Sequence, residues 1–477
     1  MRIKVTTIGL AVLASMLCWS VAAAQEKQEM HDMQRMGQIP TVKPEFPWLG
    51  KAQEKATGPR YRLEQLEQMA LANNPTLPQA QSEIRAARAR QLQSGLYPNP
   101  RAGYIGEEIR GGAFGGGQQG FFVSQTFVTG GKLGYNRKVF GHEIRITEIE
   151  AEEQRLRVLN GVRLAFYRVL AAQEMLETEK DLARIAADAL KISRQLQNIG
   201  QADETEVLQA EIEQQKLEMA VAMRENELQQ TWRALAAIAG TPELPPGIVA
   251  GDLAAVPALD EDSILETIAH ESPAVKIAEA ATDRAQATVE RERREPIPDI
   301  EVRAGLQHNG ELLEPMRCVG LQGFVEVGVQ IPLFNRNQGS VEAARAATER
   351  TRQETRRVEL ALRQRTAMVL QTHRNSRIMV ERYRVELLPR AQKAYELMIQ
   401  RYGLMLASYP QVLLAQRTLF QLQSDYISAL EGLWMNDIAL RGLLLTDGLE
   451  APARPGEIDM PVREINLPLS RAMSPER

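Results

Sequence analysis

Two segments of the chain alternate strictly between apolar and other residues. Residues 300–308 (IEVRAGLQH) and 325–331 (VEVGVQI) carry an apolar side chain at every second position. Since side chains along a β-strand alternate between two faces, each segment predicts a strand with one apolar and one polar face. Such strands suit lipid on one side and water on the other, although a soluble antiparallel sheet also fits. Residues 101–109 and 121–128 show a weaker form of the pattern.

Loops are predicted inside each strand pair. The glycine-rich residues 111–117 indicate a loop tip in the first pair, and residues 310–320 indicate a loop in the second. Met316 and Cys318 fall in this second loop, where we interpret Cys318 as an ordinary thiol in preference to a ligand for a soft metal.

Helices surround the strand pairs. One is predicted over residues 63–94 with a break at Asn-Asn-Pro, and another over 262–295 with a break at Glu-Ser-Pro. Residues 132–196 contain no proline and predict a rod of nearly 100 Å at about 1.5 Å per residue. The chain is expected to turn near residues 198–203 and to return as helix to about residue 239.

The second half of the chain repeats the first. The segments QTFVTGGKLG and ADETEVLQA of the first half correspond to QIPLFNRNQG and ASYPQVLLA of the second, at a constant offset of about 205 residues. The second long helix is therefore expected to turn near residues 403–410 and to return. The returning helix of the second copy has a heptad seam, which is less regular in the first because Gln214 and Arg224 interrupt it. The seam comprises Val412, Ala415, Leu419, Leu422, Tyr426, Ala429 and Leu433.

The chain ends differ from the repeats. Residues 1–24 have a basic start, an apolar run and Ala-Ala-Ala, which is typical of a secretory signal peptide. Residues 25–60 are proline-rich and charged, and we expect a flexible leader there. The repeats then occupy residues 61–250 and 251–448, and residues 449–477 are expected to form a disordered tail.

Composition argues against several functions. Lys and Arg number 57 against 61 Asp and Glu, so the chain has no nucleic-acid signature. There is no phosphate loop, no nucleophile elbow and no zinc-type Cys/His spacing, so we expect neither an enzyme nor a cofactor. The fold class predicted is mainly α, with strands that contribute to a membrane β-barrel.

In this order the elements resemble the TolC-type outer-membrane factor family, from about residue 61 to 448. The resemblance rests on the paired halves, residues 125–134, the run PLFNRNQG at 332–339, ELLP at 386–389 and the turn at 407–417. The PLFNRNQG run resembles the branch that serves heavy-metal efflux pumps. The resemblance implies a homotrimer with a twelve-stranded barrel in the outer membrane and a twelve-helix periplasmic tunnel, and it implies that Pro389 kinks a helix near the tunnel's equator.

The resemblance also implies partners and a gate. A periplasmic adaptor and an inner-membrane RND-type pump would meet the turns at residues 198–205 and 403–411. The best-known relative has two aspartates in the second turn, and here Gln411 and Leu414 occupy those positions. The first turn keeps its carboxylates, so we expect any charged gate to come from that copy. The candidate gate residues are Asp203, Glu204, Glu206, Arg401 and Gln411.

Two further sets of residues are candidates for contact with the exported substrate. The leader contains Met30, His31, Met33 and Met36, whose thioether and imidazole groups suit Cu(I) or Ag(I), although chance recurrence in a disordered leader is the alternative. The polar faces of the strands would line the barrel and set the electrostatics of its lumen. These lumen candidates are Glu301, Arg303, Gln307, Glu326 and Gln330.

The predicted function is therefore a passive outer-membrane channel of a tripartite efflux system, exporting heavy-metal cations such as Cu/Ag or Co/Zn/Cd. A multidrug or type I secretion duct is one alternative. A periplasmic coiled-coil adaptor is another, and it predicts a single helical hairpin flanked by small β domains.

Overall fold

The computed structural model describes residues 48–50, 58–107, 117–198, 203–314, 317–404 and 406–450, with side chains left out at 311–314, 317–318 and 403. Contacts divide the chain into Met1–Leu49 and Gly50–Arg477, and every element below belongs to the second unit. Most of the predicted leader and nearly all of the predicted tail lie outside the described residues.

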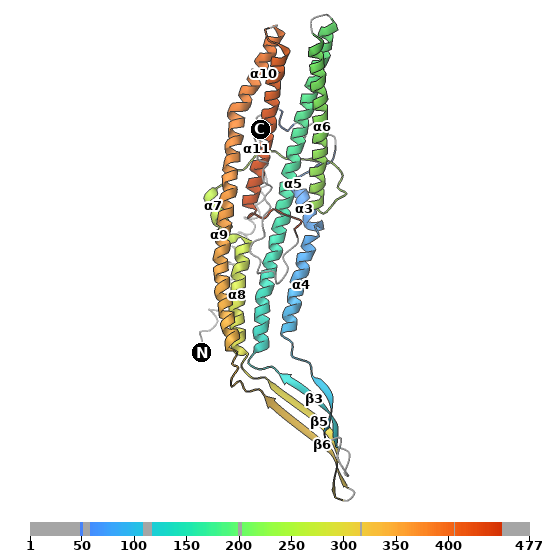
Figure 1. The fold of residues 1–477 in the computed structure, drawn as a ribbon, viewed down its shortest axis with the longest axis vertical. Helices are drawn as coiled ribbons and strands as arrows, with labels where there is room; N and C mark the ends of the chain where they lie inside the picture. The colour runs from blue at the N-terminus through green and yellow to red at the C-terminus, as the bar shows by residue number, and fades with distance from the viewer. Residues whose placement is uncertain are drawn as a thin grey trace, which may run out of the picture. The chain divides into compact units, whose positions relative to one another are not determined.

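One order of elements occurs twice (Figure 1). The first copy comprises β1 (Arg60–Tyr61), α3 (Leu63–Asn73), α4 (Thr76–Ser94), β2 (Arg101–Glu107), β3 (Gln118–Phe127), α5 (Lys132–Asn198) and α6 (Glu204–Ile238). The second comprises β4 (Ile248–Val249), α7 (Glu261–Glu271), α8 (Pro273–Arg294), β5 (Ile300–Glu314), β6 (Arg317–Val329), α9 (Gln338–Arg382), a π-helical turn (Tyr383–Leu387), α10 (Leu388–Gly403) and α11 (Tyr409–Arg441). The predicted helices, their breaks and both hairpins are confirmed.

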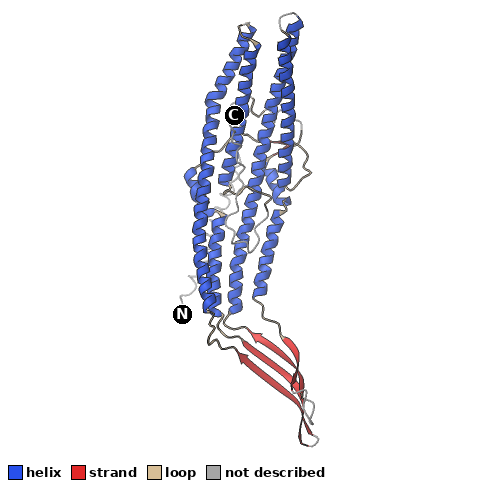
Figure 2. Cartoon of the chain, viewed as in Figure 1, coloured by secondary structure: helices blue, strands red, loops and turns tan. Residues whose placement is uncertain are grey.

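The helices of this unit run side by side, and the four-stranded sheet continues from one end of them (Figure 2). The C-terminal ends of α5 and α10 and the starts of α6 and α11 lie at the other end (Figure 1). The periodicity did not predict the short parallel pairing of β1 with β4, which joins Arg60 and Tyr61 to the chain after α6.

The large sheet is antiparallel, with strand order β2-β3-β5-β6. Its register places most apolar positions of the four strands on one face, as the alternation predicted, while Ile105, Phe122 and Phe324 lie on the other face. This face is open in the single chain: Phe121, Leu321 and Val325 are each 73% exposed. A soluble sheet would cover such a face with its own core, and the described part of this chain does not. The open face also includes Tyr104, Val123, Leu306, Val327 and Val329.

The prediction of a loop over residues 310–320 was wrong. β5 continues to Glu314 and β6 begins at Arg317, with register irregularities after Asn309 and after Leu312. The backbone N–H of Gly310 donates to the carbonyl of Gly117 and so extends the sheet (3.0 Å). Irregular ladder positions tolerate glycine, and Gly310 and Gly320 here accompany a distorted continuation of the strands. Cys318 therefore belongs to β6, and Met316 lies outside the described residues.

Helix α5 is the central support of the unit. It is 67 residues long and packs against α3, α4, α6, α8 and α11. Near its middle the Tyr167 ring stacks on Trp434 of α11, with 3.8 Å between centroids. The indole N–H of Trp434 in turn donates to the Leu253 carbonyl (2.7 Å). Apolar burial and these ring contacts join the two copies at this level.

Two buried asparagines hold the ends of the copies against this core. The Asn74 amide, 1% exposed, donates to the carbonyls of Ile238 and Gly448. The Asn160 amide donates to the carbonyls of Gly442 and Leu445. In both cases one amide group donates to two poorly hydrated backbone carbonyls near the end of a copy. Removal of the amide would leave these carbonyls without a donor.

The predicted heptad seam is confirmed in outline. Val412, Leu419, Tyr426, Ala429 and Leu433 are buried, while the other two seam residues are partly buried. The periodicity missed two polar members, Gln416 and Gln423, which are buried on the same helix. In the first copy the seam is buried at its start and then opens, in line with its interruption by Gln214 and Arg224.

Pro389 does not stop its helix. The turn before it widens to π geometry, and the Leu388 N–H bonds to the carbonyl of Tyr383, five residues back. Proline lacks an N–H and its ring crowds the carbonyl four residues earlier, here that of Val385. The widened turn accommodates that carbonyl while the helix continues into α10.

None of the helices in the described part of the chain combines the length and apolar character needed to cross a bilayer.

Replacing Asn74 by alanine is expected to lower the free energy of unfolding by about 2–4 kcal/mol, because two buried carbonyls lose their donor. Asn73 is the matched control: it is exposed, and among the described residues its side chain bonds only to the Met69 carbonyl in its own helix turn. Thermal unfolding of the detergent-solubilised protein, followed by circular dichroism, compares N74A with N73A. Equal losses of stability in the two variants would contradict the role given to Asn74.

A second prediction concerns Glu174, which is 2% exposed on α5. Burial raises its pKa to about 7, although the Gly50 N–H donates to it at 2.9 Å. The folded state therefore holds the proton more tightly than the unfolded chain. The contribution of protonated Glu174 to the stability of the folded state is fully present below about pH 4.5, and it is lost as the pH rises through 7. Glu174→Gln should increase stability at pH 8 by up to about 3 kcal/mol and have little effect at pH 4.5. The exposed Glu152→Gln on the same helix serves as control.

Candidate functional site

The predicted lumen residues share one face of the sheet. The register pairs Glu301 with Gly328, Arg303 with Glu326 and Gln307 with Gln322. These pairs lie on the face of the sheet opposite the exposed apolar face. The Gln307 amide also donates to the Gln118 side chain on β3 (2.7 Å). Gln330 follows the end of β6 and is exposed. The structure therefore brings the four strand residues together on a polar face and leaves Gln330 at its margin.

Arg303 has the most specific surroundings on this face. Its guanidinium lies 4.0 Å from the centroid of Phe122 and 5.7 Å from that of Phe324. It also lies 3.6 Å from the Glu326 carboxylate. The alternation of side chains places the Phe122 and Phe324 rings on the polar face as well. These aromatic residues were not among the lumen candidates predicted from the sequence. The signal that could have found them is the glycine opposite each ring, Gly103 and Gly305.

The predicted tip residues are divided between the two hairpins. Asp203, Glu204 and Glu206 stand at the start of α6, where carboxylates interact favourably with a helix N-terminus. Their side chains make no ion pair with another described residue. Arg401 and Gln411 belong to the other hairpin, where both line a groove of about 370 Å³ between α10 and α11. Gln411 also completes a capping box with Ser408, so it has a structural role.

A different ion pair joins the two hairpins. Arg417 of α11 donates through Nε to Glu213 of α6 (2.8 Å), and a second hydrogen bond forms between the same side chains. Glu213 is 8% exposed, so the carboxylate is held out of water against its partner. Sequence reasoning missed this pair. Glu213 comes one residue before Gln214, which the heptad pattern assigned to the seam. A charged residue next to a seam position was the signal that could have pointed to this pair.

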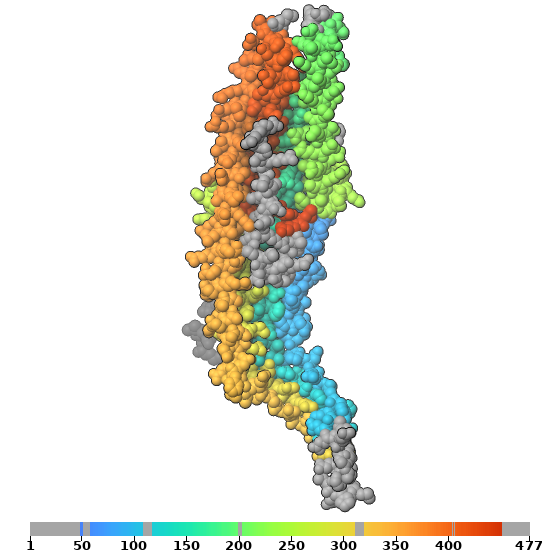
Figure 3. All heavy atoms as spheres, viewed as in Figure 1, coloured from blue at the N-terminus to red at the C-terminus, as the bar shows by residue number. Residues whose placement is uncertain are grey.

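Apolar contacts accompany this ion pair. Tyr409 packs on the cluster of Leu190, Val207 and Ala210 in the first hairpin. Phe420 packs in the same way on a cluster around Leu182 and Leu217. In the space-filling view the green surface of α6 and the orange-to-red surface of α10 and α11 lie side by side toward their tips (Figure 3). Toward their tips the two hairpins are therefore joined by the Glu213–Arg417 ion pair and by the apolar contacts of Tyr409 and Phe420.

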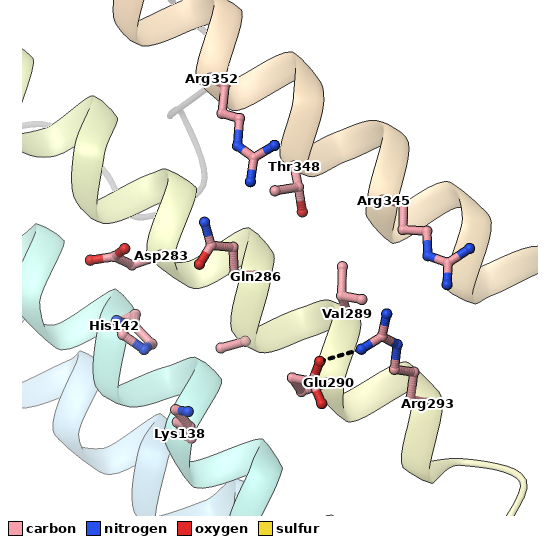
Figure 4. A pocket seen from close by; sticks show the side chains of 11 residues that line it. Lys138, His142, Asp283, Gln286, Val289, Glu290, Arg293, Arg345, Thr348 and Arg352 are labelled. Atoms are coloured by element: carbon pink, nitrogen blue, oxygen red, sulfur yellow. Dashed lines mark hydrogen bonds and ion pairs between the residues drawn. The ribbon is translucent and has the colours of Figure 1, made fainter.

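A charged groove of about 630 Å³ lies between α5, α8 and α9 (Figure 4). Lys138 and His142 come from α5, while Arg345 and Arg352 come from α9. The arginines are already engaged with acids three residues away on their own helices, as in the Arg293–Glu290 pair of α8 at 2.6 Å. Exposed pairs of this kind contribute little to stability, and the groove is a solvated, charged face.

A metal-binding role gains no support from the described residues. Among them no group of three or more His, Cys, Asp or Glu side chains is arranged to hold a metal ion. His373 is buried, neither of its ring nitrogens has a hydrogen-bond partner in the part of the chain that the structure describes, and burial lowers its pKa. Met30, His31, Met33 and Met36 lie outside the described residues, so the predicted soft-metal segment stays a prediction.

Comparison with solved structures shows the fold. CusC superposes with a TM-score of 0.63 at 19% identity, covering 80% of this chain and 91% of CusC. The outer membrane protein VceC of Vibrio cholerae superposes with a TM-score of 0.65 at 18% identity, covering 81% of this chain and 97% of VceC. Both are described as membrane proteins, and CusC as forming a transmembrane channel.

Curated relatives are metal-resistance proteins. The chain is 30% identical to the nickel-cobalt-cadmium resistance protein NccC of Alcaligenes xylosoxydans xylosoxydans, over 66% of this chain and 71% of NccC. It is 26% identical to the cobalt-zinc-cadmium resistance protein CzcC of Cupriavidus metallidurans, over 79% of this chain and 88% of CzcC. The family model described as outer membrane efflux protein matches residues 66–241 and 264–444, which are the two copies. The chain therefore belongs to the outer membrane efflux protein family and is an outer-membrane protein.

Proposed function

We propose that three copies of this chain form the passive outer-membrane channel of a tripartite system that exports heavy-metal cations. The observation that carries the proposal is the sheet. It has four strands, an exposed apolar face and a charged face, and its edge strands β2 and β6 are unpaired within the described residues. Four strands are too few for a closed membrane barrel, whereas three copies supply twelve.

The exposed faces of the helices support the same assembly. On α6, Ile212, Met219 and Met223 are each more than half exposed, and on α9 so are Met368 and Ile378. Contiguous exposed apolar positions on helices favour contact with another helix. Neighbouring copies in a ring would cover these faces and close a periplasmic tunnel from the α5–α6 and α10–α11 hairpins.

The partners proposed are a periplasmic adaptor and an inner-membrane RND-type pump, which would meet the hairpin tips. The groove lined by Arg401, Gln411 and Leu414 lies in that region. The adaptor identity for this chain itself is disfavoured, because it predicts one helical hairpin and the structure has two. Transport energy has to come from the pump, since the sequence has no nucleotide-binding motif.

The proposed cargo rests on the relatives. NccC and CzcC are named for resistance to nickel, cobalt, zinc and cadmium. We therefore place divalent cations of this kind first and Cu(I) or Ag(I), suggested by the methionine-rich leader, second. A multidrug or type I secretion duct is the alternative within the same fold, and it predicts sensitivity to organic compounds instead of metals.

Loss of the chain from its host is expected to increase sensitivity to Co²⁺, Ni²⁺, Zn²⁺ or Cd²⁺, with organic antibiotics unaffected. Growth inhibition by each compound is measured in the deletion strain and after complementation. Outer-membrane fractions of the complemented strain are examined for a heat-resistant trimer on denaturing gels. Sensitivity to antibiotics alone would favour the multidrug alternative, and a soluble periplasmic monomer would overturn the channel.

The ion pair between Glu213 and Arg417 is proposed to hold the tips closed. Charged hydrogen bonds of this kind contribute about 1.5 kcal/mol or more, so Arg417→Gln should raise the open-to-closed ratio roughly ten-fold. Single-channel recording in planar bilayers measures it. Arg194→Gln is the matched control, because Arg194 pairs with Glu211 (2.7 Å) inside one hairpin.

The double variant D203N/E206Q tests the carboxylates of the first turn as a separate gate. If it opens the channel while Arg417→Gln does not, closure depends on those carboxylates and the proposed role of the inter-hairpin pair fails.

A further inference from the structure

The polar face of the sheet is organised in transverse rows. One row across the four strands reads Gly103, Phe122, Gly305, Phe324, so that rings and glycines alternate. Each ring leans over the neighbouring glycine: a Cβ built on Gly103 would lie 2.7 Å from the Phe122 ring, and one on Gly305 would meet the Phe324 ring at the same distance. The rings are thereby laid flat along the sheet.

The adjacent row carries the charges. It reads Arg101, Ser124, Arg303, Glu326. The Arg303 side chain reaches from this row to the row of rings, and its guanidinium lies over Phe122 and beside Phe324. A guanidinium stacked on aromatic faces gains both electrostatic and packing energy, and its planar group is well suited to such contacts.

The two members of the ion pair differ in freedom. The Arg303 side chain is 30% exposed, and its Nε is buried without a hydrogen-bond partner in the described part of the chain. Glu326 is 66% exposed and meets Arg303 at 3.6 Å. The cation is therefore fixed by two rings, whereas the carboxylate is exposed to water and counter-ions. A cation held at one place in a lumen acts on every passing ion, and water and counter-ions screen an exposed carboxylate more strongly.

We propose that Arg303, held by Phe122 and Phe324, is the residue that determines the charge selectivity of the outer-membrane pore. This inference rests on the proposed function, since it requires the polar face to line a lumen. With three copies, three fixed guanidiniums occupy one level of the pore. They disfavour the return of external cations, while the pump drives cargo outward against this barrier.

The test is the reversal potential of single channels under a KCl gradient. It is measured near 0.1 M salt, where charges act over about 10 Å. Arg303→Gln should raise the cation-to-anion permeability ratio on the order of two- to ten-fold. Arg101→Gln is the matched control, because Arg101 has the same charge, lies in the same row and forms no ion pair with another described residue. It should change the ratio by less than half as much.

Two variants separate the effect of the stacking of Arg303 on the two rings from the effect of its charge. Arg303→Lys keeps the charge without the planar stack, and F122L/F324L keeps Arg303 without its rings. Both should move the permeability ratio toward that of Arg303→Gln. If they match the wild type, or if Arg101→Gln equals Arg303→Gln, the inference is wrong although the channel stands. If no variant and no wild-type protein forms a channel, the proposed function fails first.

Discussion

Packing along α5 is the constraint on which the rest of the structure depends. This helix begins next to the sheet and ends at the tip, and α3, α4, α6, α8 and α11 all contact it. At its first turn Lys132 pairs with Asp299, which also accepts the Thr129 N–H, so the start of the rod is fixed to the approach of β5. Near its middle the stack of Tyr167 on Trp434 joins it to the second copy. Both ends of the molecule are therefore positioned by one uninterrupted element.

Most of this architecture could be predicted because periodicity reports it directly. The alternation at residues 300–308 places Arg303 on the correct face, and Asn-Asn-Pro at 73–75 marks a true helix break. Periodicity did not predict the strand at residues 310–320, because the two strands stay paired there although their register is irregular. It also failed for pairs of distant residues, since the contact of Glu213 with Arg417 depends on how two helices are rotated toward each other. No single-helix pattern contains that rotation.

The two copies have acquired different tasks. The second copy supplies the regular seam of α11, the π turn and the Arg303–Glu326 pair, whereas the first supplies the continuous α5 and the carboxylates that begin α6. They meet through Glu213 from one copy and Arg417 from the other. The proposed gate therefore belongs to neither copy, and the proposed lumen charge, which depends on Phe122 and Phe324, is likewise shared between the strand hairpins.

The alternation of rings and glycines also bears on the ancestry of the sheet. Gly103 and Gly305 differ in number by 202, as do Phe122 and Phe324, and as do Arg101 and Arg303. The two hairpins therefore carry the arginine, the glycine and the ring at matching positions, as expected of a duplicated unit. Divergence came at the neighbouring position, where Ser124 faces Arg101 and Glu326 faces Arg303. In both copies the glycine of the strand leaves the space that a phenylalanine ring of the neighbouring strand occupies.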